Sequence, residues 1–393
     1  METAKYFTLC ASEKLQKVDV HAESTTYRHQ EFRDVCVTHK TLRGGPSDGV
    51  DLFVLSNGQI SVFVMPTRGM GIWKVHLMRN GEKIRVGWNS PVNVPVNPRN
   101  VPLMQSDGLG WLRGFNEFVV RCGLESNGSP EYDENGRLQY GLHGFIANTP
   151  ASQVKLEVDD VRKTVSLTGI VREARLFFNS LELHSRITLP FEGTMFRIDD
   201  EVRNIRSRPC EMELLYHINI GNPIADTGAK IHIPYRRVAP RNAFSATQIE
   251  ELFSYHAPTV GEPETCYYYD LATDESGNTR TFLEDPSGEV GVSVAFNQNE
   301  FPHFCQWKCQ HAREDGYVTG MEPATSFPNN HSFEKANGRV IELPPGEKRH
   351  FGLDFRFCTT SDEVQEEVAK VAQIQALTPN PIQEKEPDPQ WAN

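Results

Sequence analysis

The 393-residue sequence lacks any long run of apolar side chains, and no stretch approaches the roughly 20 residues that a membrane-spanning helix needs. It lacks a basic excess as well, because its formal net charge is −12. Nucleic acids and anionic membrane surfaces attract basic proteins, so neither is expected as a partner. The sequence opens without a basic segment followed by an apolar one, which predicts no signal peptide and a cytoplasmic location.

Cysteine is too sparse for a disulfide scaffold. The eight cysteines are scattered and form no C-x-x-C pair, so we expect reduced thiols. A zinc site is an alternative at one place, where four potential ligands fall close together: His303, Cys305, Cys309 and His311. Their spacing fits no standard zinc pattern. We therefore expect neither a metal nor another cofactor.

Helical periodicity is scarce too, and period-2 alternation dominates the sequence. Short runs of alternating apolar and polar residues with turn residues between them are typical of an antiparallel sandwich or barrel. Strands are expected at residues 51–64 (a hairpin), 72–78, 154–158, 164–171, 181–189, 196–202, 210–220, 289–296, 317–322, 339–343 and 350–357.

The domain organisation follows from these runs. Residues 1–360 should form a single all-β domain, in which the proline-rich segment 89–109 is a long ordered loop over one end of a sheet. Residues 361–378 should form a C-terminal helix with Ser361 as its N-cap. Residues 379–393 are rich in proline and charge and should be an exposed tail.

Three short stretches carry residues suited to acid–base chemistry. In YGLHGFIAN, His143 lies between two glycines, which allow a sharp turn or a close approach to a ligand. In LLYHINIGN, His217 lies inside an apolar strand, and Asn219 two residues later shares its face. In GYVTGMEPATSFPNN, Glu322 ends a strand just before Pro323. Each residue alone has an ordinary structural explanation, so the hypothesis of a site rests on their occurring together.

The order of these stretches resembles the aldose 1-epimerases of the galactose mutarotase-like superfamily. The segments MPTRGMGIW, GWNSP, HGFIANTPA and YHINIGNP are similar to an uncharacterised aldose-epimerase-like subgroup, and the match spans about residues 64–357. The resemblance implies a β-supersandwich of large antiparallel sheets with a sugar in a concave cleft. It also implies that His217 is the general acid, Glu322 the general base and His143 a substrate ligand or assisting donor in the same catalytic group.

The chemistry of anomer exchange needs these residue types. A carboxylate can take the proton of the anomeric hydroxyl while an imidazolium gives one to the ring oxygen, which opens the sugar ring. The same pair could instead epimerise a keto sugar by enolisation, or catalyse elimination. A non-catalytic sugar-binding protein is the third alternative, although a pure binder has no use for an acid and a base together.

Further residues are candidates for the sugar cleft. Arg68 could donate a fork of hydrogen bonds, Trp88, Trp111 and Trp307 could stack on a sugar face, and Asn219 and Asp226 could bond hydroxyls. Each has a structural alternative, such as a turn ion pair or core packing. The front half carries PTRGMG where the family has an asparagine-and-arginine pattern, so a modified, oxidised or phosphorylated sugar is an alternative to free hexoses. The oligomeric state stays open.

Overall fold

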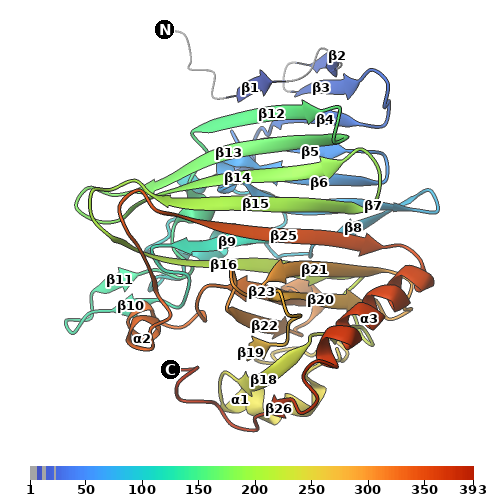
Figure 1. Ribbon diagram of the computed structural model, residues 1–393. Helices are drawn as coiled ribbons and strands as arrows, with labels where there is room; N and C mark the ends of the chain where they lie inside the picture. The colour runs from blue at the N-terminus through green and yellow to red at the C-terminus, as the bar shows by residue number, and fades with distance from the viewer. Residues whose placement is uncertain (1–6, 11–14, 22–23) are drawn as a thin grey trace.

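The computed structural model describes residues 7–10, 15–21 and 24–393, and its main feature is two large β-sheets packed face to face (Figure 1). The smaller sheet has nine strands, which are antiparallel except for the pair β1 and β12. In order across the sheet they are β1 (Phe7–Cys10), β12 (Gln153–Asp159), β13 (Thr164–Ala174), β14 (Ser180–Pro190), β15 (Met195–Asn204), β25 (Lys348–Cys358), β21 (Gly291–Asn297), β20 (Asn278–Glu284) and β17 (Lys230–His232).

The larger sheet carries the candidate site. In order across it lie β2 (Leu15–His21), β3 (Ser24–His29), β4 (Cys36–Thr41), β5 (Asp51–Ser56), β6 (Ile60–Met65), β7 (Gly71–Arg79), β9 (Val119–Leu124), β16 (Cys210–Gly221), β23 (Val318–Ala324), β22 (His303–Cys309), β19 (Thr265–Leu271), β18 (Tyr235–Pro240) and β26 (Ile382–Gln383). Two further strands join it, β8 (Glu82–Val86) beside β7 and β24 (Ile341–Leu343) beside β16. A separate hairpin pairs β10 (Glu131–Tyr132) with β11 (Leu138–Tyr140). The expectation of an all-β fold with large antiparallel sheets is confirmed.

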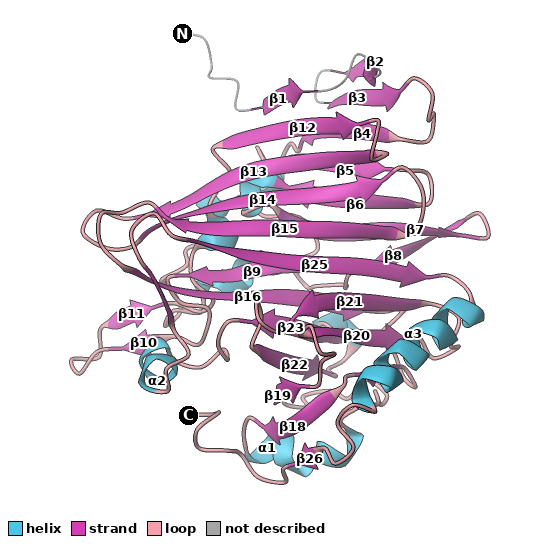
Figure 2. Cartoon of the chain, viewed as in Figure 1, coloured by secondary structure: helices cyan, strands magenta, loops and turns pink. Residues whose placement is uncertain are grey.

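Helix is limited to short elements and one C-terminal helix (Figure 2). The α-helices are α1 (Ala243–Thr247), α2 (His331–Ala336) and α3 (Ser361–Gln375), and the 3₁₀ turns are η1 (Gly45–Ser47), η2 (Pro66–Arg68), η3 (Pro98–Asn100), η4 (Gly110–Gly114), η5 (Ile146–Asn148), η6 (Ile249–Glu251) and η7 (Arg313–Asp315). The N-cap of α3 is Thr360, whose hydroxyl accepts a hydrogen bond from the Glu363 N–H. The expectation of Ser361 as the cap was wrong by one residue, because the helix already includes Ser361.

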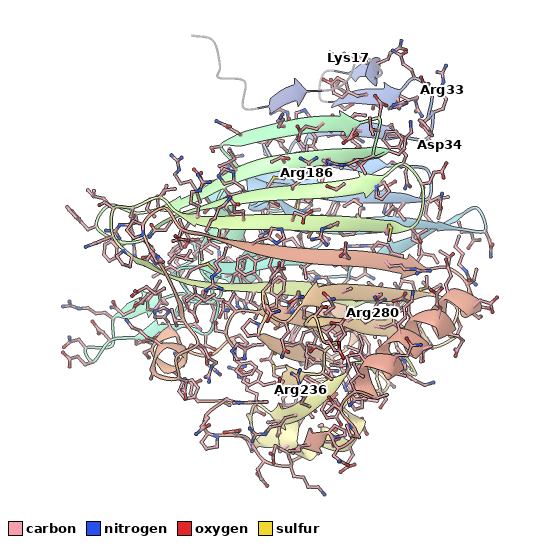
Figure 3. The ribbon with its side chains drawn as sticks, in the orientation of Figure 1. Lys17, Arg33, Asp34, Arg186, Arg236 and Arg280 are labelled. Carbon is pink, nitrogen blue, oxygen red and sulfur yellow. The ribbon has the colours of Figure 1, made fainter. Side chains whose placement is uncertain are left out.

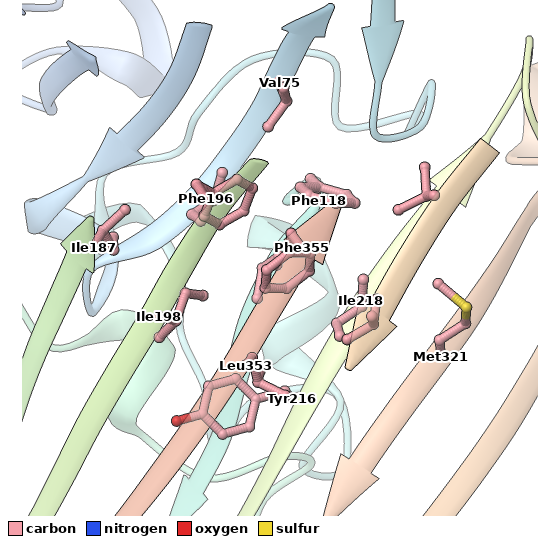
Figure 4. Packing of buried hydrophobic residues seen from close by; sticks show 14 of the residues in the cluster. Val75, Phe118, Ile187, Phe196, Ile198, Tyr216, Ile218, Met321, Leu353 and Phe355 are labelled. Carbon is pink, nitrogen blue, oxygen red and sulfur yellow. The ribbon is translucent and has the colours of Figure 1, made fainter. Parts of the chain in front are cut away.

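The main hydrophobic core lies between the two sheets (Figure 4). Phe196 of β15 stacks on Phe355 of β25, with ring centroids 4.5 Å apart, and both belong to the same core cluster as Ile218 and Met321 of the larger sheet. Side chains alternate along a strand, so Tyr216 and Ile218 of β16 face this core. His217 between them must therefore face the other side of the larger sheet.

The outer faces of the two sheets differ in character. On the smaller sheet the outer face carries charged side chains, such as Arg186 on β14, which pairs with Glu157, and Arg280 on β20, which pairs with Glu367 of α3 (Figure 3). On the larger sheet every residue of β23 is buried, so both of its faces are covered. A second cluster of buried apolar residues lies there, including Trp88, Trp111, Phe115, Leu215 and Ala324. A site on this face is therefore shielded from water.

The C-terminal segment is more closely packed than its composition predicts. Its strand β26 pairs in parallel with β18, and the ring of Trp391 lies 5.4 Å from that of Phe327. The Trp391 carbonyl oxygen accepts a 2.8 Å hydrogen bond from Asn329. The sequence predicted an exposed tail over residues 379–393. Many of its side chains are exposed, but its backbone and Trp391 contact the body of the protein.

Candidate functional site

A cavity of about 290 Å³ opens on the outer face of the larger sheet. Its walls come from four strands, from the loops around η4 and η5, and from the segment after β23. The lining residues are Leu109, Trp111, Leu112, Phe115, Ser129, Pro130, Leu142, His143, His217, Arg241, Glu264, Cys266, Cys305, Trp307, Glu322 and Pro328. Three of them, His143, His217 and Glu322, are the residues that the sequence singled out as catalytic, although they lie far apart along the chain.

Strand register brings His217 and Glu322 together. β16 and β23 are antiparallel, with Leu215 opposite Ala324 and Ile218 opposite Met321, which sets His217 opposite Glu322. Nε2 of His217 lies 3.2 Å from Oε1 of Glu322, and the two residues are only 5% and 2% exposed. Neither Glu322 Oε1 nor His217 Nδ1 has a hydrogen-bond partner in the described part of the chain. Two polar atoms at the cavity wall are thus left with unused bonding capacity, which is typical of a ligand-binding site.

His143 reaches the same cavity from a tight turn. Its φ is 58°, in the left-handed region, between Gly141 and Gly144 of the turn that the sequence indicated. Its Nδ1 lies 2.7 Å from the carbonyl oxygen of Asn127. A carbonyl oxygen can only accept, so Nδ1 carries the hydrogen and Nε2 of the neutral ring is an acceptor. The His143 and His217 rings lie nearly perpendicular, with centroids 5.7 Å apart.

Burial determines the protonation of these three groups. Burial lowers the pKa of His143 to about 4, and it lowers the pKa of His217 well below its ordinary value, with the neighbouring His143 adding to the effect. Burial also raises the pKa of Glu322 well above the usual carboxyl range. Burial therefore favours the neutral forms of both histidines and of the Glu322 carboxyl group.

Aromatic rings form much of the cavity wall. Phe115 lies 5.1 Å and Trp307 5.2 Å from the His217 ring, both edge-on. Trp111 makes a similar contact with His143 at 4.7 Å. The indole nitrogen of Trp307 donates a 2.7 Å hydrogen bond to the exposed Glu264, which fixes the ring at the mouth of the cavity. Such rings suit the apolar faces of a sugar.

Four residues that the sequence suggested as sugar ligands do not line this cavity. Arg68 is fully buried and bonds Glu117 through two nitrogens, at 2.9 and 2.6 Å, and Gly114 O at 2.9 Å. Trp88 packs under Phe115, with centroids 4.9 Å apart, and its indole nitrogen donates to the Glu117 carbonyl. Both therefore hold the loop that forms the cavity wall.

The other two are engaged elsewhere. The amide nitrogen of Asn219 donates to the backbone carbonyl oxygens of Glu117 and His217, at 3.0 and 3.1 Å. Asp226 pairs with the exposed Arg313. The Asn219 amide nitrogen and the Asp226 carboxylate are therefore already engaged, whereas Asn219 Oδ1 has no hydrogen-bond partner in the described part of the chain. The sequence could not reveal this, because it does not show which loops fold over the sheet.

The cavity also contains polar residues that the sequence did not indicate as part of a sugar site, although it offered Cys305 as a possible zinc ligand. Cys305 and Cys266 come from β22 and β19, and register places Cys305 beside Glu322. Arg241 directly follows β18, and Ser129 precedes β10. Only the strand order across the sheet, which the sequence does not give, brings them to one place.

The described residues contain neither a metal-binding cluster nor a membrane-spanning helix. No three His, Cys, Asp or Glu side chains there are grouped as a metal-binding set. No described helix is long and apolar enough to cross a membrane.

The sequence matches a protein family across most of its length. The family is described as a domain of unknown function, DUF4432, and the match covers residues 47–357. The chain belongs to the DUF4432 family. No curated protein matches this DUF4432 chain.

Solved structures show how this DUF4432 protein relates to known folds. A candidate aldose 1-epimerase from Klebsiella pneumoniae is 29% identical, with a TM-score of 0.85 over 93% of this chain and 92% of that one. A galactose mutarotase-like protein from Clostridium acetobutylicum is 14% identical, with a TM-score of 0.56 over 83% and 99% of the two chains. Galactose 1-epimerase from Lactobacillus acidophilus is 12% identical, with a TM-score of 0.53 over 82% and 98%. The DUF4432 chain therefore has the galactose mutarotase-like fold, a β-supersandwich, as the sequence resemblance predicted.

Proposed function

We propose that this DUF4432 protein is an aldose 1-epimerase-like isomerase that interconverts sugar anomers. The observation that carries the proposal is the His217–Glu322 pair, with 3.2 Å between the two side chains at the wall of a sugar-sized cavity. The fold shared with the candidate aldose 1-epimerase of Klebsiella pneumoniae supports it. In this proposal His217 and Glu322 are the acid–base pair and His143 is a substrate ligand.

The close contact of the pair fits the chemistry of the hemiacetal. The anomeric hydroxyl oxygen and the ring oxygen are bonded to the same carbon, so one side-chain pair can face both. Ring opening removes one proton from the hydroxyl and adds one to the ring oxygen, so the pair must hold a single proton throughout. Glu322 as carboxylate accepts the first, and His217 as imidazolium donates the second. Ring closure on the other face of the aldehyde runs both transfers backwards.

The resting protonation state requires one preparatory step. Before a sugar binds, burial favours the proton on Glu322, because burial raises the pKa of Glu322 and lowers that of His217. A sugar hydroxyl that donates to the carboxyl group stabilises its ionised form. Because the two side chains are 3.2 Å apart, the proton can then pass directly to His217 Nε2. Substrate binding thus produces the carboxylate and the imidazolium together.

His143 has a different role in this proposal. Its Nδ1 is committed to the carbonyl oxygen of Asn127, and its pKa of about 4 keeps the ring neutral. The ring therefore offers Nε2 as a hydrogen-bond acceptor to a sugar hydroxyl. His143 should hold and orient the sugar, while His217 and Glu322 move protons.

The proposal is tested by proton NMR of the purified protein with a panel of aldoses, uronic acids, sugar phosphates and keto sugars. Saturation transfer between anomeric signals should appear for one member and should fall about 10²–10⁴-fold in Glu322→Gln and His217→Gln. Glu322→Gln should retain sugar affinity, whereas His143→Ala should weaken both affinity and rate. Deuterium uptake at carbon would instead indicate enolisation, and binding without any exchange would indicate a sugar-binding protein.

A further inference from the structure

The cavity contains one permanent cation, Arg241, that forms no salt bridge with a carboxylate of the described residues. Arg241 lines the cavity, and it is the sole lysine or arginine among the described residues that do so. Both histidines there are neutral near pH 7, because burial lowers their pKa values. The positive charge that faces a ligand in this cavity therefore belongs to Arg241.

Three other arginines that are withdrawn from solvent have a carboxylate partner. Arg68 pairs with Glu117 at 2.6 Å, Arg121 with Asp200 at 2.5 Å, and Arg339 with Glu334 at 2.5 Å. A charge removed from water without a partner is destabilising, so such pairing is the rule in folded proteins. In each of these three ion pairs a carboxylate neutralises the guanidinium group.

Arg241 differs from these three arginines. Over the residues that the structure describes, no carboxylate oxygen lies within the 4.0 Å limit of an ion pair from its guanidinium nitrogens. One of those nitrogens donates a long hydrogen bond of 3.3 Å to the hydroxyl of Ser129. A guanidinium group has five N–H donors, so most of its bonding capacity is available.

The two acids of the cavity wall are occupied otherwise. Glu264 is exposed at the mouth, where it accepts the 2.7 Å hydrogen bond from the Trp307 indole. Glu322 lies against His217, and burial raises its pKa, with the charge of Arg241 acting in the opposite direction. The charge of Arg241 thus lowers the pKa of Glu322, although the two side chains form no salt bridge.

The strand order places the backbone of Arg241 three strands away from that of Glu322. Across the sheet, β23 with Glu322 is followed by β22, β19 and β18, and Arg241 is the residue after β18. Three strand spacings separate the backbones by about 14 Å. The long arginine side chain spans part of this distance, and a ligand the size of one sugar ring can fill the rest. A group bound by Arg241 would therefore lie away from the anomeric carbon.

We propose that the substrate is an acidic sugar and that Arg241 binds its anionic group. A planar guanidinium fork matches both a carboxylate and a phosphate, so a uronic acid and a sugar phosphate share the required chemistry. This inference rests on the proposed function, because it names the substrate class of that same cavity. It assigns Arg241 as the residue that selects acidic sugars over neutral hexoses.

Isothermal titration calorimetry of the full chain tests the assignment. The probes are glucuronate and galacturonate, their uncharged methyl esters, glucose 6-phosphate and glucose. At least one acidic sugar should bind about 10–100-fold more tightly than its uncharged counterpart, which is the range of a charge-assisted hydrogen bond. Whether a uronate or the phosphate gives this preference identifies the anionic group.

Variants separate the role of Arg241 from a general effect of charge. Arg241→Gln should remove the preference for the acid and leave the affinity for the ester unchanged, and Arg241→Lys should keep part of it. The matched control is Arg237→Gln, on β18 but paired with Glu384 and Asp388 of the tail. It should leave the preference intact.

The inference and the proposed function fail in distinguishable ways. Equal affinity of wild type for every acid and its ester would overturn the role of Arg241, as would an equal loss for acid and ester in Arg241→Gln. Anomer exchange on neutral sugars would still support the isomerase in that case. Conversely, selective binding of an acidic sugar without anomer exchange would support Arg241 and overturn the isomerase. Glu322→Gln, which should bind but not turn over, keeps the two readouts independent.

Discussion

The carboxylate of Glu322 occupies the space above Gly320. A Cβ atom at residue 320 would lie 2.3 Å from Oε1 of Glu322 and 3.2 Å from Cε1 of His217. Gly320 lies on β23, the strand that carries Glu322, with Asn219 opposite it on β16 and Trp307 opposite it on β22. The missing side chain at this position is what allows the acid–base pair to lie in contact.

We expect Gly320→Ala to impair turnover far more than folding. The clashing atom is the end of a flexible side chain, so Glu322 can move aside at little cost in stability. A displacement of about 1 Å at a reacting group can reduce the rate about 10²-fold. Anomer exchange should fall by that factor while the melting temperature changes by only a few degrees.

A double-mutant cycle provides the control for Gly320. In a Glu322→Gln background, Gly320→Ala should have little further effect on the rate, because both changes act through the same carboxylate. Additive losses of rate would mean that Gly320 acts on catalysis by another route.

The pH dependence of kcat/KM should report the shared proton of His217 and Glu322. A falling pH adds a second proton to the pair and removes its acceptor, and a rising pH removes the last proton and with it the donor. Burial disfavours the imidazolium, so the acid limb should lie well below the ordinary histidine pKa of 6.5. Burial also disfavours the carboxylate, so the basic limb should lie well above the ordinary carboxyl pKa of 4.5.

Polarimetry on a verified substrate, corrected for spontaneous mutarotation, gives this profile. The two apparent pKa values belong to the pair and not to either residue. Each of His217→Gln and Glu322→Gln should abolish the bell shape. An acid limb near pH 6.5 in wild type would show that His217 titrates as a solvated histidine, against the buried contact described above.

Much of the fold was predictable from the sequence because period-2 patterning is local. The runs at 164–171, 181–189 and 196–202 alternate clearly, and they correspond to β13, β14 and β15, whose outer faces carry charge. Strands such as β9 (VVRCGL) and β22 (HFCQWKC) are covered on both faces and do not alternate, so no strand was predicted there.

The candidate site was predictable only in part, for a related reason. His143, His217 and Glu322 stand out by local context: a glycine-flanked turn, a polar residue in an apolar strand, and a strand end before proline. Arg241 has no such context, and its place in the cavity depends on the order β23, β22, β19, β18 across the sheet. Strand order is a long-range property that a local pattern does not contain.

Arg68 should act on stability and not on sugar recognition. Its guanidinium group bonds Glu117, Asn148 and the Gly114 carbonyl, with the Arg68 and Glu117 side chains both fully buried. Arg68→Met removes the ion-pair partner of the buried Glu117 carboxylate, which keeps only the hydrogen bond from the Asn116 N–H, and such a loss typically costs about 3–5 kcal/mol. Urea unfolding should show this loss, and the double variant Arg68→Met with Glu117→Gln should recover part of it. Unchanged stability with lost sugar affinity would instead return Arg68 to the role of a sugar ligand.

The C-terminal segment lies beside the cavity and should contribute to stability and to sugar binding. Trp391 packs on Phe327 and lies under the guanidinium group of Arg237, whose central carbon is 4.7 Å from the ring centroid. Trp391→Ala should lower the free energy of unfolding by about 1–2 kcal/mol, from the loss of one aromatic pair and one cation–π contact. The exposed Lys385 of the same segment is the matched control, and Lys385→Ala should have no measurable effect.

Removing residues 379–393 should lower the free energy of unfolding more than Trp391→Ala does, because it also removes the partners of Arg237. Truncation should weaken sugar binding as well, since Phe327 adjoins Pro328 of the cavity wall. A truncated protein with unchanged melting temperature and affinity would show that the docked segment contributes nothing to either.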